Sequence, residues 1–213
     1  MSTGGAAGSS PLLDPAPDWD RPGLTENLRE YIVLRHGCTS WDLHNIQSNP
    51  VVLIDPRAGR TDVDFGQGFY TTSIERQARH WAWKRYYDIP LGTPGPPGVP
   101  LQPVVLKFRV PLVRLAGLEA LHFVLGDYED ERFWSLVQYC RRSPPGVARS
   151  HLHPSRSDGW YDVVTGPVAD FWRQRSTMRQ ADQVSFHTTQ AAHVLNNLIR
   201  SDVTDDFDWK PVI

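Results

Sequence analysis

Strand-like and helix-like segments alternate between residues 31 and 200, and their order constrains the fold more than any other feature. Short β-branched and aromatic runs predict strands at residues 31–35, 69–72, 104–110, 161–165 and 183–187. Apolar residues at helical spacing predict helices at residues 41–47, 73–87, 128–140 and 190–200. The strands and helices do not repeat as regular βαβ units, which favours an α+β fold.

Capping and turn residues mark where several of these segments begin and end. His36 and Gly37 follow the first strand-like run, so we expect the strand to end there in a turn. Ser73 is expected to cap the second helix, and Thr188 or Thr189 the last one. Residues 166–170, which follow the strand at 161–165, are interpreted as a fixed turn.

Length and composition place the chain among globular proteins of one domain. Apolar residues make up 40% of the 213 residues, enough to build a core. The 22 Lys and Arg nearly balance the 24 Asp and Glu, so the net charge does not indicate a nucleic-acid partner. A balanced net charge does not exclude a local basic groove. No apolar run approaches the roughly 18 residues of a membrane span, and no signal peptide is recognisable. We expect a soluble cytoplasmic protein with no membrane partner.

Two stretches are expected to lie outside the packed core. Residues 1–23 are rich in Gly, Ala, Ser and Pro and are predicted to be a disordered N-terminal tail. Residues 90–103 contain prolines that fix φ and remove N–H donors, so they are predicted to form a surface loop. Residues 24–213 would then form a single domain.

Residues 64–72 (DFGQGFYTT) form the most informative segment for function. Gly66 and Gly68 allow positive φ and a close approach of the backbone to a ligand, or form a β-bulge or tight turn. The segment is not a dinucleotide-binding fingerprint, because that pattern follows a strand, opens a helix and has a third glycine. A phosphate-binding loop with Gly-Lys-Ser/Thr is absent as well.

Other chemically active residues have plain structural explanations. His36 and Cys38 could share a strand face as a nucleophile pair, but a small buried cysteine is the more frequent case. His151 and His153 lack a second pair of zinc ligands, so no metal site is expected and both are interpreted as solvated loop residues. Gln183 starts a strand whose polar side chains alternate with apolar ones.

Four motifs in order resemble the ADP-ribosyltransferase superfamily. They are RHG, DFGQGFYTT, YDVVTGPVAD and DQVSFHT, at residues 35–37, 64–72, 161–170 and 182–188. The spacing is similar to the diphtheria-toxin and poly(ADP-ribose)-polymerase branch, which has a His–Tyr–Glu signature, and most similar to an uncharacterised bacterial and fungal subfamily. The resemblance covers about residues 31–200. It implies a split, strongly bent antiparallel sheet with flanking helices around a nicotinamide pocket.

The resemblance also implies a role for several residues in binding NAD as co-substrate, without a metal. His36 would hydrogen-bond the adenosine ribose, and the Gly37 backbone would bind the nicotinamide carboxamide. Tyr70 would stack on the nicotinamide ring, and Trp81, eleven residues later, would close its other side or be a core aromatic. Gly68 would let the backbone approach NAD.

Two positions depart from the family pattern. Ala78 replaces the serine that binds the carboxamide, so that hydrogen bond is either lost or supplied by Thr71, Thr72 or Ser73. Gln183 replaces the catalytic glutamate, which stabilises positive charge on the ribose as nicotinamide leaves.

Losing the negative charge of the glutamate costs about 2–4 kcal/mol of transition-state stabilisation, or about 10²–10³ in rate. Asp182 would substitute only if the strand is bulged, and Asp170 is a further candidate for shaping the pocket.

These residues favour an NAD-dependent mono-ADP-ribosyltransferase with His36, Tyr70 and Gln183 as the catalytic set. The acceptor would be a protein, a nucleic acid or a small molecule. The alternatives are an NAD glycohydrolase, an inactive module that binds NAD or ADP-ribose, and a related RNA 2′-phosphotransferase. The last would use Arg35, Arg57, Arg60 and Arg79 to bind phosphates. Residues 49–61 and 90–103 are the loops expected to select the acceptor.

Overall fold

A computed structural model describes residues 31–48, 54–123, 130–196 and 199–203, and they form an α+β arrangement. The predicted tail at residues 1–23 lies outside the described residues. Within them, no helix is long and apolar enough to cross a membrane.

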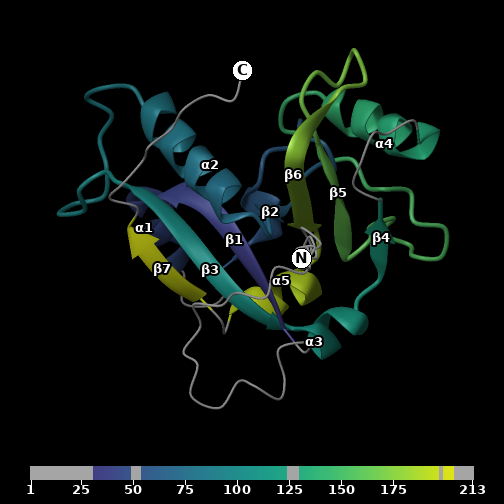
Figure 1. Cartoon of the computed structure of the whole chain (residues 1–213), viewed down its shortest axis with the longest axis horizontal. Helices are drawn as coiled ribbons and strands as arrows, with labels where there is room; N and C mark the ends of the chain where they lie inside the picture. The colour runs from purple at the N-terminus through teal and green to yellow at the C-terminus, as the bar shows by residue number, and fades with distance from the viewer. Residues whose placement is uncertain (1–30, 49–53, 124–129, 197–198, 204–213) are drawn as a thin grey trace, which may run out of the picture.

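The strands form two sheets, which lie side by side in Figure 1. The first sheet is antiparallel and has the order β1–β3–β7. The second sheet has the order β2–β6–β5–β4, in which only the β4–β5 pair is parallel among the described strands. The strands are β1 (Tyr31–Thr39), β2 (Phe69–Thr71), β3 (Pro103–Pro111), β4 (Ala120–His122), β5 (Val163–Ala169), β6 (Thr177–Phe186) and β7 (Ile199–Val203).

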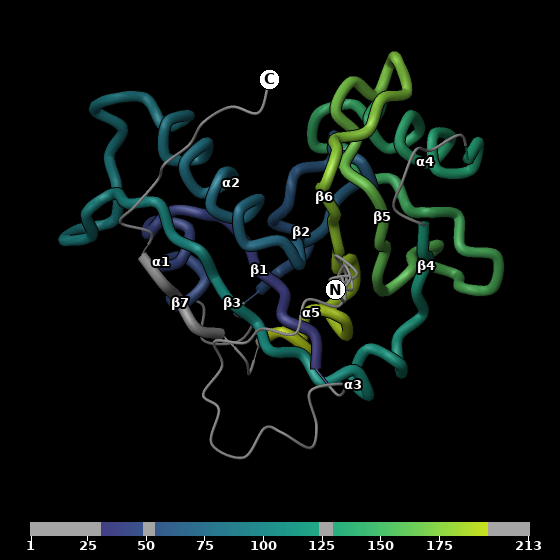
Figure 2. The backbone as a smooth tube through the Cα atoms, in the orientation of Figure 1, coloured from purple at the N-terminus to yellow at the C-terminus, as the bar shows by residue number. Residues whose placement is uncertain are grey.

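Helices flank both sheets. In Figure 1, α2 covers the first sheet, α4 lies beside the upper ends of β5 and β6, and α5 lies between the sheets. The continuous trace in Figure 2 shows the loop after α2 extending away from the sheets before the chain returns as β3. The helices are α1 (Ser40–Ser48), α2 (Glu75–Asp88), α3 (Leu112–Ala116), α4 (Glu131–Arg141) and α5 (Thr189–Asn196), with a 3₁₀ turn at Pro56–Ala58.

A backbone bridge between Arg35 on β1 and Thr72 after β2 joins the two sheets. Each residue donates its N–H to the carbonyl of the other, at 2.7 and 2.8 Å. Apolar side chains from both sheets and from α5 form one core beside this junction, including Leu34, Phe186 and Leu195. Burial of these apolar side chains stabilises the contact between the sheets more than the two backbone hydrogen bonds do.

The structure confirms the predicted helices and strands in outline and corrects several boundaries. His36 and Gly37 lie inside β1, which continues to Thr39, and not in a turn. Residues 166–169, predicted as a turn, belong to β5, because Gly166 pairs with Gln183 on β6. Thr188 caps α5 as predicted, accepting the N–H of Ala191, whereas β4 and β7 were not predicted.

Ser73 does not cap α2. The cap position is Ile74, which offers no side-chain hydrogen bond, and Ser73 donates its hydroxyl to Asp182 instead. The local sequence pattern assigns the Ser73 side chain to the helix cap, but it bonds the buried carboxylate of Asp182 instead.

Gly37 is required by the packing of α2 on β1. A Cβ atom at residue 37 would lie 2.0 Å from the carbonyl oxygen of Ala78 and 2.6 Å from the backbone nitrogen of Ala82. Both alanines are fully buried on the face of α2 that meets the strand. The helix backbone thus lies directly on the strand backbone at this position.

Gly37→Ala should destabilise the protein by at least about 2 kcal/mol, because the helix must move away from the strand. Chemical unfolding of the variant measures this loss. Gly117→Ala is the matched control, since the nearest atom to its new Cβ is 4.0 Å away and its φ is negative. Equal stability of the two variants would contradict the packing argument.

Candidate functional site

His36 presents an unused hydrogen-bond acceptor near the junction of the sheets. Its Nδ1 lies 2.6 Å from the carbonyl oxygen of Tyr70, and the ring packs against Phe69 at 4.4 Å between centroids. Burial lowers the pKa of His36, so its ring is neutral near pH 7. Because a carbonyl only accepts, Nδ1 carries the proton and Nε2 is the acceptor. Among the described residues, Nε2 has no partner.

Tyr70 is fixed by its hydroxyl on the second sheet. The hydroxyl donates to the carbonyl of Gly66 at 2.7 Å and accepts the N–H of Phe65 at 2.9 Å. Burial raises the pKa of Tyr70 well above its usual value, so the hydroxyl stays protonated. The half-buried ring packs beside the aromatic cluster around Phe65. The segment 64–70 therefore closes on itself through this side chain.

Gly68 has a packing role that the sequence pattern did not distinguish from ligand binding. A Cβ there would lie 2.7 Å from Nδ1 of His187, which hydrogen-bonds the carbonyl of Gln67 at 2.7 Å. The other ring nitrogen of His187 lies 2.8 Å from the hydroxyl of Ser185. The glycine thus lets the 64–70 segment contact β6.

Gln183 is held by two acceptors that fix the direction of its amide. Its Nε2 donates to Oδ2 of Asp64 and to the carbonyl of Pro167, both at 2.8 Å. Both amide protons are therefore used, and among the described residues Oε1 accepts no hydrogen bond. Gln183 is 6% exposed. Its Oε1, which accepts no hydrogen bond from the described residues, is not fully buried, so part of this oxygen remains accessible.

Asp182 lies on the opposite side of β6 and holds the start of α2. It accepts the hydroxyls of Thr72 and Ser73 and the N–H of Ser73 at 3.1 Å. Gln77 pairs with its backbone through both amide atoms. Asp182 is fully buried, so burial raises its pKa. These bonds account for Asp182 without a role at Gln183.

The hydroxyls expected to replace the missing serine at Ala78 have no proton left to donate. Thr71 donates to the carbonyl of Val184 at 2.8 Å, and Thr72 and Ser73 donate to Asp182. All three are buried. The expected hydroxyl donor for a carboxamide is therefore not present in this arrangement.

Trp81 and Asp170 differ in how they relate to the junction. Trp81 is half-buried on α2, and its Cβ would be 3.0 Å from a Cβ at Gly37, so it lies next to the strand position that the resemblance implies. Asp170 is exposed, and its N–H bonds the carbonyl of Ser176 in the turn after β5. Among the described residues, no hydrogen bond or ion pair joins its side chain to Gln183 or His36.

Two residues that the sequence did not single out complete the surroundings of Gln183. Asp64 is 2% exposed and also accepts the N–H of Ala169 at 2.8 Å. Arg141 at the end of α4 pairs with the other carboxylate oxygen, at 2.8 Å from Nε and 2.6 Å from Nη2. An acidic residue before the glycine segment was the available signal, but its arginine lies 77 positions away.

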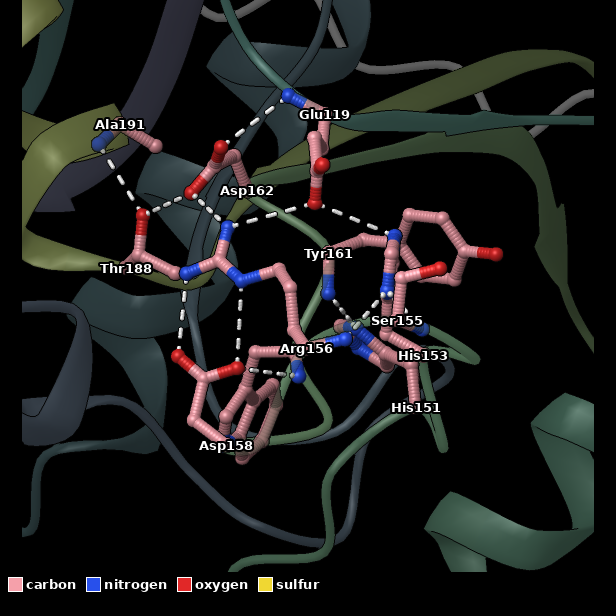
Figure 3. Close-up of polar contacts among 11 residues, drawn as sticks. Glu119, His151, His153, Ser155, Arg156, Asp158, Tyr161, Asp162, Thr188 and Ala191 are labelled. Carbon is pink, nitrogen blue, oxygen red and sulfur yellow. Dashed lines mark hydrogen bonds and ion pairs between the residues drawn. The ribbon is translucent and has the colours of Figure 1, made fainter.

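The segment before β5 is fastened by a buried aspartate (Figure 3). Asp162 accepts Arg156 at 2.9 Å, the N–H of Glu119 at 3.0 Å and the hydroxyl of Thr188. His151 lies nearby and is buried, not solvated as predicted: Nε2 meets the carbonyl of Phe65 and Nδ1 accepts an N–H. His151 thereby links this segment to the glycine segment at Phe65.

The geometry gives little support to a cysteine nucleophile, to phosphate binding by the four arginines or to a metal site. Cys38 is buried, and burial raises its pKa, so a reactive thiolate is disfavoured. The four arginines considered for phosphate binding all pair with carboxylates: Arg35 and Arg79 with Glu75, Arg57 with Asp55 and Arg60 with Asp62. Within the described ranges, no cluster of three His, Cys, Asp or Glu is suited to a metal ion.

Comparison with known proteins matches this chain to a protein family. A family model described as a protein of unknown function, DUF3990, matches residues 46–173. The matched range includes Tyr70, Trp81 and Asp64, whereas His36 and Gln183 lie outside it. Neither the curated proteins nor the solved structures contain a significant match.

Buried neutral histidines should make the fold sensitive to acid. Burial lowers the pKa of His151 to about 4, and the pKa of the adjacent His187 is lowered well below its usual value. The unfolded chain therefore binds more protons below about pH 6.5. Stability is complete above that pH and falls toward pH 4, by on the order of 3 kcal/mol for His151 alone.

Chemical unfolding across this pH range checks the expectation, with His151→Gln as the comparison. The amide keeps a donor for Phe65 and an acceptor for the N–H of Tyr161, so the fold is retained. The variant should lose less stability on acidification than the wild type. Parallel curves would show that His151 is not the residue responsible.

Proposed function

This chain belongs to the DUF3990 family, and we propose that it is an NAD-dependent mono-ADP-ribosyltransferase. In this reaction the bond between nicotinamide and ribose breaks, nicotinamide leaves, and an acceptor attacks the positively charged ribose carbon. The acceptor would be a protein, a nucleic acid or a small molecule. A cytoplasmic location is part of the same proposal.

The amide of Gln183 is the observation that carries the proposal. Both of its protons are used, so its oxygen is a fixed acceptor without a partner among the described residues. Nε2 of His36 is a second such acceptor on the neighbouring sheet. Ribose hydroxyls are donors, and NAD carries two riboses, so two separate acceptors suit this substrate.

The architecture gives further support. The resemblance implies a split sheet, and the first and second sheets are distinct and joined at Arg35 and Thr72. His36 and Tyr70, which the resemblance assigns to NAD binding, lie on the strands that meet at this junction. Trp81 lies beside Gly37 on α2, where an aromatic side chain could cover the nicotinamide ring.

The chain's own residues would act on the substrate without a metal. Gln183 would accept the hydrogen bond of the ribose 2′-hydroxyl and orient the sugar as nicotinamide leaves. His36 would hold the other ribose, and the ring of Tyr70 would contact the nicotinamide. With water as the acceptor, the same arrangement would give an NAD glycohydrolase.

Incubation with NAD, with and without cell lysate, tests the proposal. Free nicotinamide is measured by chromatography and adducts by mass spectrometry. Nicotinamide release together with a mass gain on a lysate component is the expected result. Release without adducts would indicate a glycohydrolase, binding without release would indicate an inactive module, and the absence of NAD binding would contradict the proposal.

Gln183→Met should lower nicotinamide release at least about 10-fold, because methionine has nearly the same length but no amide oxygen. His36→Ala should mainly weaken NAD binding, measured by calorimetry. Gln174→Met makes the same chemical change at an exposed position and should leave both values unchanged. Wild-type release by Gln183→Met would show that its oxygen does not contact the substrate.

A further inference from the structure

The glutamine at residue 183 is matched to a buried carboxylate, and its neutral amide is required by that partner. Asp64 and the carbonyl of Pro167 both point their oxygens at Nε2. A glutamate at this position would bring a third acceptor against two acceptors with no proton among them. Such an arrangement loses two hydrogen bonds and adds repulsion between two buried carboxylates.

The charge of Asp64 is itself well compensated. Arg141 donates twice to Oδ1, while Oδ2 accepts from Ala169 and Gln183. The hydroxyl of Tyr70 and the thiol of Cys140 also interact with Asp64. Burial raises the pKa of Cys140 to about 12 and that of Tyr70 above its usual value, so both stay neutral.

We propose that Asp64 is a positioning residue that orients the amide of Gln183, so that an Asp–Gln pair takes over the work of a single catalytic glutamate. This inference rests on the proposed function. Asp64 holds the NH₂ end of the amide inward and thereby turns Oε1 outward as the acceptor for a ribose hydroxyl. The hydrogen bond to a carboxylate also increases the negative partial charge on Oε1. Part of the electrostatic stabilisation that a neutral amide lacks is recovered in this way.

The first test measures coupling between the two residues without any substrate. Gln183→Glu should lower the melting temperature by about 5 °C or more, and adding Asp64→Asn should recover part of that loss, since the asparagine NH₂ can donate to the new carboxylate. Asp162→Asn removes another buried carboxylate, which lies one residue before β5 begins and makes no hydrogen bond with Gln183. Its effect on the melting temperature should simply add to that of Gln183→Glu.

The second test uses the pH dependence of nicotinamide release. At lower pH a proton can bridge the introduced carboxylate and Asp64 in the Gln183→Glu variant and restore the hydrogen bond of the amide. The ratio of variant to wild-type turnover should therefore rise at least about 10-fold from pH 8 to pH 5.5. Asp64→Asn should lower kcat about 10-fold with little change in KM, because it acts on the orientation of Gln183.

The two tests separate this inference from the proposed function. Coupled stabilities support the Asp64–Gln183 pair even if NAD is not turned over, in which case the proposed reaction fails alone. Additive stabilities, or wild-type stability of Gln183→Glu, would overturn the inference whatever the enzyme activity. A pH-independent turnover ratio together with wild-type kcat for Asp64→Asn would overturn it as well.

Discussion

The contacts of Thr72 and Ser73 hold the structure together at the point where its two sheets meet. Thr72 forms the backbone bridge to Arg35 on β1, and both hydroxyls donate to the buried Asp182 on β6. The guanidinium of Arg35 donates to the carbonyl of Ser73 at 2.7 Å. Three strands and the start of α2 therefore depend on two residues and one buried carboxylate. A group that is buried and charged must be fully paired, so this junction tolerates few alternatives.

The same junction determines where the candidate site residues lie. His36 follows Arg35 on β1, Tyr70 precedes Thr72 by two residues, and Gln183 follows Asp182 on β6. Side chains alternate along a strand, so His36 and Gln183 face away from their neighbours Arg35 and Asp182, which make the structural contacts. Asp182 serves the fold and Gln183 presents an unused oxygen for this reason. Adjacent residues can thus divide the structural and chemical roles between them.

Hydrophobic patterning predicted much of the fold, but long-range pairing was beyond it. The segments around α2, α4 and β3 have apolar periodicity of their own and were predicted close to their observed bounds. The strand β6 was predicted at about half its length, because Asp182 and the exposed residues before it break the pattern. Gly37 was interpreted through ligand binding, and Gly68 through ligand binding, a β-bulge or a tight turn. A Cβ atom at either position would also meet a protein atom far along the chain, which no local pattern indicates.

The candidate site was only partly predictable for the same reason. The motif residues His36, Tyr70 and Gln183 were found because they lie in short local patterns. The partners that decide the chemistry of Gln183 are Asp64 and Arg141, which come from a loop and a helix distant in sequence. Local patterns contain no information on which buried acceptor a given amide meets. The interpretation of Gln183 as a weakened glutamate therefore changes once its neighbours are known.

A crystal structure of the protein with a non-hydrolysable NAD analogue would show directly which atoms contact the two riboses. We predict that the nicotinamide ribose hydrogen-bonds Oε1 of Gln183 while Nε2 of that side chain stays on Asp64. We also expect the adenosine ribose at Nε2 of His36 and the nicotinamide at Tyr70. An analogue bound away from the junction of the sheets, or a Gln183 amide turned with its oxygen toward Asp64, would contradict the proposed roles of Gln183 and His36.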